Sequence, residues 1–407
     1  MQNNWKETTL GEVAEIKGGK RLPKGQQLQC IKTFHPYIRI TDIVNNQIQT
    51  HTLQYVPDAV FPSIKRYIVS EGDIILSIVG TIGSVARINK KLHNASLTEN
   101  CVKLTNFQSI ERDFLFYYLI SKEGQAEIQS RNVGSTQPKL PIYNIEKIQI
   151  LCPPLPEQKA IAAILSSFDD KIELLMRQNK TLEAIAQTTF KEWFVNFTVN
   201  GKKLKVNSKT GLPDGWRMGR LGDEFQIVMG QSPDGESYNE SGDGMIFFQG
   251  RAEFQERFPA TRLYTTEPKR IAEKFDVLVS VRAPVGDINV ASAKCCIGRG
   301  LAAVRGKYKS YALYKIKSLK DAFNKFEAEG TVFGSIGKDS FADIEAIIPD
   351  SETIKSFEMI TSPIDAKIYN NNSQIQTLSK LRDTLLPKLM KGKIRVKDSE
   401  KLREKAL

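Results

Sequence analysis

One internal repeat limits the possible folds of this chain more than any other feature of its sequence. Residues 5–12 have the pattern Trp-x-x-x-x-Leu-Gly-acidic, and residues 216–223 repeat it at an offset of 211 (216 minus 5). Gly19 falls on Gly230 at the same offset. Two similar globular halves are therefore predicted. The later matches relate 73–83 to 276–286, each with the pattern of a short buried strand that runs into a Gly or Pro turn, and more loosely 134–139 to 334–338.

After each half, apolar residues recur alternately three and four positions apart, which is the spacing of a coiled-coil seam. The first seam runs from Ile161 to Trp193, and the second runs in the same phase from Phe357 to Leu389. A helix of about 33 residues is roughly 48 Å long and needs a partner helix along its length. The other copy is the expected partner, and antiparallel pairing would place one globular half at each end.

Asn179 and Asn371 interrupt the two seams at equivalent positions. In an antiparallel pair in which facing residue numbers add up to 550, these two asparagines face each other. We expect a buried or half-buried pair, with side chains within about 10 Å, that fixes the register of the helices at some cost in stability. The alternative is that both asparagines are solvated defects of the seams.

These patterns predict an α+β protein with two similar α/β domains, two long antiparallel coiled-coil helices that separate them, and a pseudo-twofold internal repeat. Pro153 and Pro154 fix an extended start for the first helix. The expected domains are a first recognition domain over 1–152, a central spacer helix over 153–199, a linker and second recognition domain over 200–350, a distal spacer helix over 351–395, and a frayed basic tail over 396–407.

The composition favours an acidic partner and excludes several other classes of protein. The net charge of +12 favours contact with a polyanion such as nucleic acid. No apolar stretch approaches the roughly 18 residues of a membrane span, and no signal peptide follows Met1, so a cytoplasmic protein is expected. An odd number of cysteines, five, without a C-x-x-C pair, and three scattered histidines indicate neither a disulfide framework nor a metal site.

Catalytic motifs are missing from the sequence. No phosphate-binding loop of the G-x-x-x-x-G-K-[ST] type occurs, and no histidine follows His93. The only adjacent prolines, Pro153 and Pro154, do not follow an Asn or Asp, as they would in an enzyme that methylates exocyclic amino groups. We expect no catalytic residue in this chain.

Recognition of DNA requires phosphate contacts for position and base-edge contacts for choice, and polar side chains on loops provide both. For every candidate, an ordinary solvated surface residue is the alternative. The candidates in the first half are Lys20, Arg21, Arg39, Thr81, Arg87, Ser135, Thr136, Gln137 and Lys139, and those in the second half are Gln231, Ser232, Arg251, Lys269, Arg270, Arg282, Arg299 and Lys338.

Several segments, in the expected order, resemble the specificity subunits of Type I restriction-modification systems. Residues 155–173 are similar to the start of that family's central spacer helix, and 190–197 are similar to its end. Residues 211–216 resemble the usual opening of a second recognition domain, and 381–394 resemble the distal helix. The second helix lacks the Pro-Glu-Gln that opens the first.

The resemblance implies a non-catalytic subunit that selects DNA for a larger complex, with each domain reading one half of a bipartite, gapped target. It implies two modification subunits that hold S-adenosylmethionine and methylate adenine, and often a restriction subunit that uses ATP and Mg. No cofactor is then expected on this chain. An autonomous two-headed DNA-binding regulator is the alternative function, and an enzyme fused to recognition domains is a further one.

On this resemblance, Trp193, Phe194 and Phe197 are candidate residues for docking the modification subunits. The alternative is that these aromatic side chains cap the coiled coil against a recognition domain.

Overall fold

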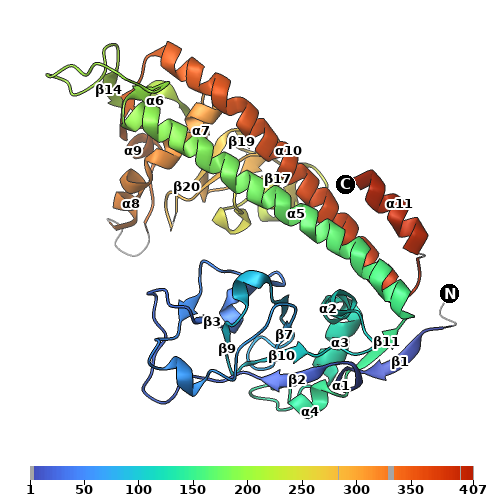
Figure 1. Ribbon diagram of the computed structural model, residues 1–407. Coiled ribbons are helices and arrows are strands. Elements are labelled where there is room, and N and C mark those ends of the chain that lie inside the picture. The colour runs from blue at the N-terminus through green and yellow to red at the C-terminus, as the bar shows by residue number, and fades with distance from the viewer. Residues whose placement is uncertain (1–3, 283, 329–333, 395, 407) are drawn as a thin grey trace. The chain divides into compact units, whose positions relative to one another are not determined.

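The computed structural model describes residues 4–282, 284–328, 334–394 and 396–406, which form two compact units (Figure 1). The first unit comprises Met1–Leu174 and Ile375–Leu407, and the second comprises Leu175–Gln374. Each unit contains its own sheets and short helices together with a part of each long helix.

The first unit is built around a four-stranded antiparallel sheet with the strand order β2-β10-β7-β8. The apolar run that the sequence marks as a buried strand forms β7, and all of its side chains are buried. The sheet strands are β2 (Glu15–Gly18), β7 (Ile74–Ser77), β8 (Val85–Arg87) and β10 (Cys101–Thr105); the smaller sheets are formed by β1 (Lys6–Thr9) with β11 (Gln149–Cys152), by β3 (Pro36–Ile38) with β6 (Gln54–Tyr55) and β9 (Ser96–Leu97), and by β4 (Ile43–Val44) with β5 (Gln47–Ile48).

The central helix of the first unit is α2 (Arg112–Ile120), which packs against β8. Its side chains from Phe114 to Leu119 are all buried, so the helix is apolar on every side, as is typical of a helix enclosed by other elements. The other short helices are α1 (Leu10–Val13), α3 (Lys122–Ser130) and α4 (Ile142–Ile145).

The second unit repeats the four-stranded sheet, the two-stranded pairing of its first and last strands and the order of the short helices, which confirms the repeat inferred from the sequence; a further sheet has five strands, in place of three in the first unit. Its main antiparallel sheet has the order β15-β23-β20-β21, and the side chains of β20 are again all buried. The elements are β14 (Arg217–Arg220) paired with β24 (Glu345–Ile348); β15 (Gln226–Met229), β20 (Val277–Ser280), β21 (Ile288–Val290) and β23 (Leu301–Arg305); β16 (Tyr238–Asn239), β17 (Met245–Phe248), β18 (Leu263–Thr265), β19 (Ile271–Ala272) and β22 (Cys295–Ile297); and helices α6 (Leu221–Glu224), α7 (Lys309–Ser318), α8 (Lys320–Ala328) and α9 (Lys338–Ala342).

A repeated glycine follows the first strand of each main sheet. A Cβ on Gly19 would lie 2.0 Å from the carbonyl oxygen of Thr98, and a Cβ on Gly230 would lie 2.1 Å from that of Gly298. Because no side chain fits at either position, the same close backbone approach explains why glycine occurs in both copies.

The two long helices are α5 (Leu155–Phe190) and α10 (Ser351–Met390). Every position of the two predicted seams is buried or half-buried. In the second unit, Asn179 lies next to Asn371 while Trp193 contacts Phe357 edge to face, so the helices run antiparallel there. In the first unit, Arg382 of α10 donates to Asp169 of α5 at 2.7 Å, which fits the same register.

The asparagine pair expected from the seams is present in the second unit. Asn371 Nδ2 donates to Asn179 Oδ1 at 2.9 Å, and Asn371 is buried while Asn179 is half-buried. An amide pair in an otherwise apolar seam favours this register, because any shift would leave the buried amide without its partner.

Replacing Asn179 and Asn371 together with leucine is expected to raise the stability of the chain by about 1 kcal/mol, since apolar contacts replace a buried polar pair. The midpoint of urea unfolding measures this effect. The single Asn371→Leu variant is the comparison, because it leaves the Asn179 amide without its partner. A double variant less stable than the wild type would show that the asparagine pair contributes net stability, and that it does not fix the register at the expense of stability.

The start of α10 differs from that of α5 and was uncertain from the sequence. Asp350 caps it, because its carboxylate accepts hydrogen bonds from the backbone N–H groups of Glu352 and Thr353 at 3.0 and 2.9 Å. The helix also continues through Pro363, although proline in a helix interior costs about 3 kcal/mol.

One expectation about the connecting segments was wrong, and the structure adds detail to another. The C-terminal segment, predicted as a frayed tail, forms helix α11 (Val396–Ala406). The predicted linker begins with a hairpin of β12 (Thr198–Val199) and β13 (Lys202–Lys203), in which Asn200 and Gly201 take the positive φ angles that a two-residue hairpin turn requires. Across the described residues, no helix combines the length and the apolar character needed to cross a membrane.

Candidate nucleic-acid interface

A buried serine holds the turn after the central strand in each unit. Ser77 Oγ accepts a hydrogen bond from Ser84 N at 2.8 Å and donates to the carbonyl oxygen of Thr81. In the second unit, Ser280 Oγ accepts from Asp287 N at 2.8 Å and donates to the Pro284 carbonyl oxygen at 2.8 Å. The two turns are therefore built by the same contacts, although the residues at their tips differ.

Four backbone segments of the first unit meet around its turn. Leu140 N donates to Ile78 O at 2.9 Å, and Ile78 N donates to Asn100 O at 2.8 Å. Lys20 N donates to Leu97 O at 2.8 Å, which brings the segment after β2 to the same place. We name these segments the first loop cluster: residues 19–21, 78–83, 98–100 and 133–140.

The second unit assembles the corresponding segments with the same backbone pattern. Ile336 N donates to Val281 O at 3.1 Å, and Val281 N donates to Gly300 O at 2.9 Å. Gln231 N donates to Ile297 O at 3.0 Å. The second loop cluster consists of residues 230–232, 281–282 with 284–286, 298–300 and 334–338.

Most of the predicted DNA-contact residues lie in these two clusters, and nearly all of their side chains are exposed. Arg21 forms a surface ion pair with Glu99 at 2.9 Å, and Ser232 is half-buried and accepts a hydrogen bond from Arg299 N at 3.2 Å. The cluster candidates are Lys20, Arg21, Thr81, Ser135, Thr136, Gln137 and Lys139 in the first unit, and Gln231, Ser232, Arg282, Arg299 and Lys338 in the second.

Five predicted DNA contacts lie outside the clusters. Arg39 binds the buried carboxylate of Asp42 at 2.8 Å and supports its own loop. Arg251 and Lys269 form surface ion pairs, whereas the Arg270 carbonyl oxygen accepts from Ile297 N, so Arg270 lies beside the second loop cluster. The fifth of these residues, Arg87, lies in a polar network inside the first unit.

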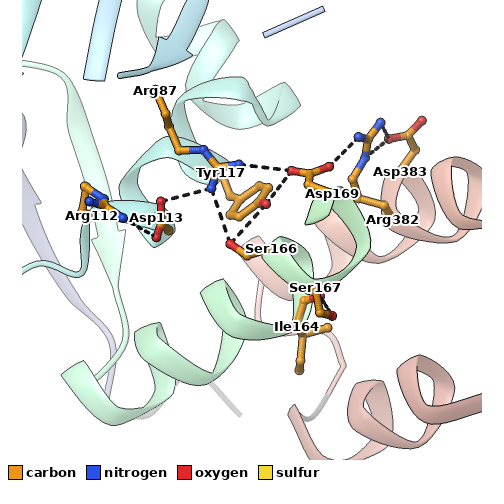
Figure 2. Close-up of polar contacts among 10 residues, drawn as sticks. All are labelled: Arg87, Arg112, Asp113, Tyr117, Ile164, Ser166, Ser167, Asp169, Arg382 and Asp383. Atoms are coloured by element: carbon orange, nitrogen blue, oxygen red, sulfur yellow. Dashed lines mark hydrogen bonds and ion pairs between the residues drawn. The ribbon is translucent and has the colours of Figure 1, made fainter. Parts of the chain in front are cut away.

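Arg87 takes part in a polar network on helix α5 (Figure 2). Its guanidinium lies 3.1 Å from Asp113 and 3.7 Å from Asp169. Tyr117 of α2 donates to the same Asp169 carboxylate at 2.5 Å, and Arg382 of α10 donates to it at 2.7 Å. We correct the prediction for Arg87: its charge is used within the unit to hold α2 and β8 against the long helices.

The second unit contains an equivalent network that the sequence did not reveal as such. Tyr314 of α7 donates to Asp365 of α10 at 2.9 Å. Arg257 donates to Asp365 at 2.5 Å and also binds Glu183 of α5. The tyrosine and the aspartate occupy equivalent positions in the two repeats, whereas the arginine comes from β8 in one unit and from a loop in the other. We call the two networks the helix anchors.

Charge compensation keeps two of the helix-anchor carboxylates, Glu183 and Asp113, ionised. Burial alone would raise the pKa of Glu183, but the charges of Arg257 and Lys317 outweigh burial and lower it. For Asp113, burial also acts to raise the pKa, and Arg112 and Arg87 lower it overall. The Glu183 and Asp113 carboxylates therefore remain charged at neutral pH and bind their cationic partners through charge-assisted hydrogen bonds.

The aromatic residues proposed for subunit docking are mostly enclosed by the second unit. Trp193 and Phe194 are each 5% exposed, and both rings pack on Phe357. Phe197 is half-buried and contacts Trp216 edge to face. The structure supports the alternative stated above, in which these side chains cap the coiled coil, because two of the three rings are almost completely buried within the second unit.

The helix anchors are the residues that sequence reasoning missed. Tyr117 and Tyr314, like Asp169 and Asp365, recur at nearly the same repeat offset, so a longer comparison of the two halves would have found them. Nothing in the sequence identifies their arginine partners, because these come from non-equivalent positions. Among the described residues, no three His, Cys, Asp or Glu side chains are arranged to hold a metal ion.

Comparison with known proteins matches both repeats. The family model for the Type I restriction modification DNA specificity domain covers residues 2–184 and 213–380. The putative type I restriction enzyme MjaX specificity subunit of Methanocaldococcus jannaschii is 32% identical over 97% of this chain and 98% of its own length. The type I restriction enzyme HindI specificity subunit of Haemophilus influenzae is 23% identical over 96% of this chain and its entire length.

The fold has a solved counterpart. The crystal structure of a Type I restriction-modification S subunit from M. genitalium superposes with a TM-score of 0.65 at 18% identity and covers 95% of this chain and 96% of that one. The family expected from the spacer-helix segments is confirmed by the family model and by the relative at 32% identity. With its two matched repeats, its long antiparallel helices and a relative above 30% identity across nearly its whole length, the chain belongs to the Type I restriction modification DNA specificity family.

Proposed function

We propose that each unit reads one half of a bipartite DNA target through its loop cluster. The observation that carries this proposal is a shared backbone scaffold with different side chains. Val79 and Thr81 lie in one serine-held turn, and Arg282 and Pro284 occupy the equivalent positions of the other. Because base choice depends on side-chain donors and acceptors, the two units would read different sequences from one geometry.

The paired helices are proposed to set the gap between the two half-sites. The 36 residues of α5 correspond to about 54 Å, or roughly one and a half turns of B-DNA. A fixed register of the two helices, such as the one that the asparagine pair favours, would keep the gap between the half-sites constant.

The chemistry is proposed to reside on partner subunits. Two modification subunits would dock on the helices, hold S-adenosylmethionine and methylate adenine, and a restriction subunit would use ATP and Mg to cleave DNA. This chain would then bind DNA and its partners without a cofactor of its own. The relatives support this division, since they are named specificity subunits.

Mapping methylated adenines in the source genome tests the whole proposal. The expected result is one asymmetric motif with two short specified parts and an unspecified gap between them. Deleting the gene for this chain should abolish methylation at that motif, and restoring the gene should recover it. A continuous motif, or methylation that persists in the deletion strain, would contradict the proposal.

Replacing Arg282 with alanine is expected to reduce affinity for the target about ten-fold and to relax the choice of base in one half-site alone. The side chain is exposed, so the fold should be unaffected. Binding to a set of single-base target variants measures both effects. Arg220→Ala, which removes an exposed cation of the same unit outside the loop cluster, is the control and should bind as the wild type does. Undiminished selectivity of Arg282→Ala would remove this residue from the interface.

A further inference from the structure

The first unit exposes two large apolar side chains on one short loop. Phe34 is 94% exposed and Ile31 is 76% exposed, which makes them the most exposed of the large apolar side chains in the described part of the chain. Leaving a phenylalanine in water forgoes the favourable free energy of burying it. Such a loop in a folded domain indicates a contact surface.

The loop is held in place by its backbone. Gln29 and Tyr55 exchange two hydrogen bonds at 2.9 and 2.8 Å on one side of it. On the other side, Thr33 Oγ1 donates to the carbonyl oxygen of Val56 at 2.9 Å, and Val56 N donates to His35 O at 2.9 Å. The exposure of Phe34 is therefore built into a supported loop, since both flanks are bonded to β6 and the residue after it.

The charged residues of the segment that carries the loop are all basic, unlike those of its counterpart, and one acidic residue, Asp58, lies 3.5 Å from His35 at the edge of the loop. Residues 20–35 contain four Lys or Arg and no Asp or Glu, whereas residues 231–244 of the second unit contain four Asp or Glu and no Lys or Arg. Lys20 and Arg21 of the same segment belong to the first loop cluster. The segment that leads to the apolar tip thus begins in the proposed DNA surface and carries the positive charge that a phosphate backbone attracts.

We propose that Phe34, supported by Ile31, is a wedge that inserts between base pairs of the half-site read by the first unit. Two apolar side chains cover far too little area for a stable protein interface, but a single apolar side chain is enough to unstack one base step. Flanking cations such as Lys32 would hold the phosphates on either side. This inference rests on the proposed reading of DNA by the loop clusters and adds that only one half-site is distorted.

The test uses the complete complex of this chain with its modification subunits, and duplexes that carry the mapped target. 2-Aminopurine, whose fluorescence rises when it unstacks, is placed at successive steps of either half-site. We expect a rise at one step in the half-site of the first unit and none in the other half-site. Phe34→Ala should abolish the rise and weaken binding about ten-fold, which is the scale of one lost stacking contact, whereas Phe34→Trp should preserve both.

A duplex with a mismatch at the affected step separates a wedge from an ordinary contact. A mismatched step is already easier to unstack, so it should restore much of the affinity of Phe34→Ala. Met218→Ala, which shortens an exposed apolar side chain of the second unit, serves as the control and should behave as the wild type.

Three results would overturn the inference. Unchanged fluorescence and affinity in Phe34→Ala would exclude a wedge while leaving the reading of DNA intact, because the wild-type complex would still select its target. Loss of modification subunits from the Phe34→Ala complex, measured by sedimentation, would assign the loop to a protein contact. Failure of the wild-type complex to select the target would refute the proposed function and the wedge together.

Discussion

Replacing Asp365 with alanine is expected to lower the free energy of unfolding by about 3 kcal/mol. Arg257 is 10% exposed and Asp365 18% exposed, so the substitution leaves a buried guanidinium without one of its two carboxylates. Tyr314 also loses its acceptor. Urea unfolding of the purified chain, monitored by tryptophan fluorescence, measures the effect.

A surface pair provides the matched control. Asp343 forms an ion pair with Arg220 at 2.8 Å, but its side chain is 58% exposed. Asp343→Ala is expected to cost less than about 1 kcal/mol, because solvent screens exposed pairs. Equal effects of the two variants would show that the helix anchor contributes no more than a surface contact.

Lengthening both long helices by one heptad is expected to move methylation to targets with a longer gap. Duplicating 176–182 in α5 and 368–374 in α10 repeats the two facing stretches around the asparagine pair, so the seams keep their phase. Seven residues add about 10 Å, which corresponds to about 3 base pairs. Genome-wide mapping of methylated adenine should find the original target unmodified and a new one with the same half-sites.

Duplicating the heptad in α5 alone provides the comparison. The two seams would then be of unequal length, and this variant should lose stability without gaining a new target. If the variant with both insertions still methylates the original target with its original gap, the helices do not set the spacing.

The helices and the repeat were predictable because their signals are periodic. A seam position repeats every three or four residues, so a misplaced residue changes the interpretation little, and both seams are buried or half-buried throughout. The start of α10, which lacks Pro-Glu-Gln, was not predictable from that pattern. Asp350 caps this start, and the role of its side chain depends on local backbone geometry. Tail helix α11 has few apolar residues and gave no clear periodic signal.

The candidate site was predictable only in part. The loop segments that carry Thr81 and Lys139 were predictable because turn signals and the repeat marked them, and the structure brings these segments together. Arg87 was misassigned, because a sequence cannot distinguish an arginine that faces solvent from one that pairs with Asp113 in the folded unit. Which distant residue a charged side chain binds depends on tertiary packing. No short sequence pattern identifies that partner.

The pairing of the first and last strands of each globular part has a consequence for how new specificities arise. Lys6 lies opposite Cys152 in β1 and β11, and Arg217 lies opposite Ile348 in β14 and β24. Each globular part therefore starts and finishes at one two-stranded ribbon beside the start of a long helix. A different recognition domain joined at that two-stranded ribbon would therefore be attached to the same long helices. Recombination at two short stretches of the gene would then exchange the part of the target that this domain reads.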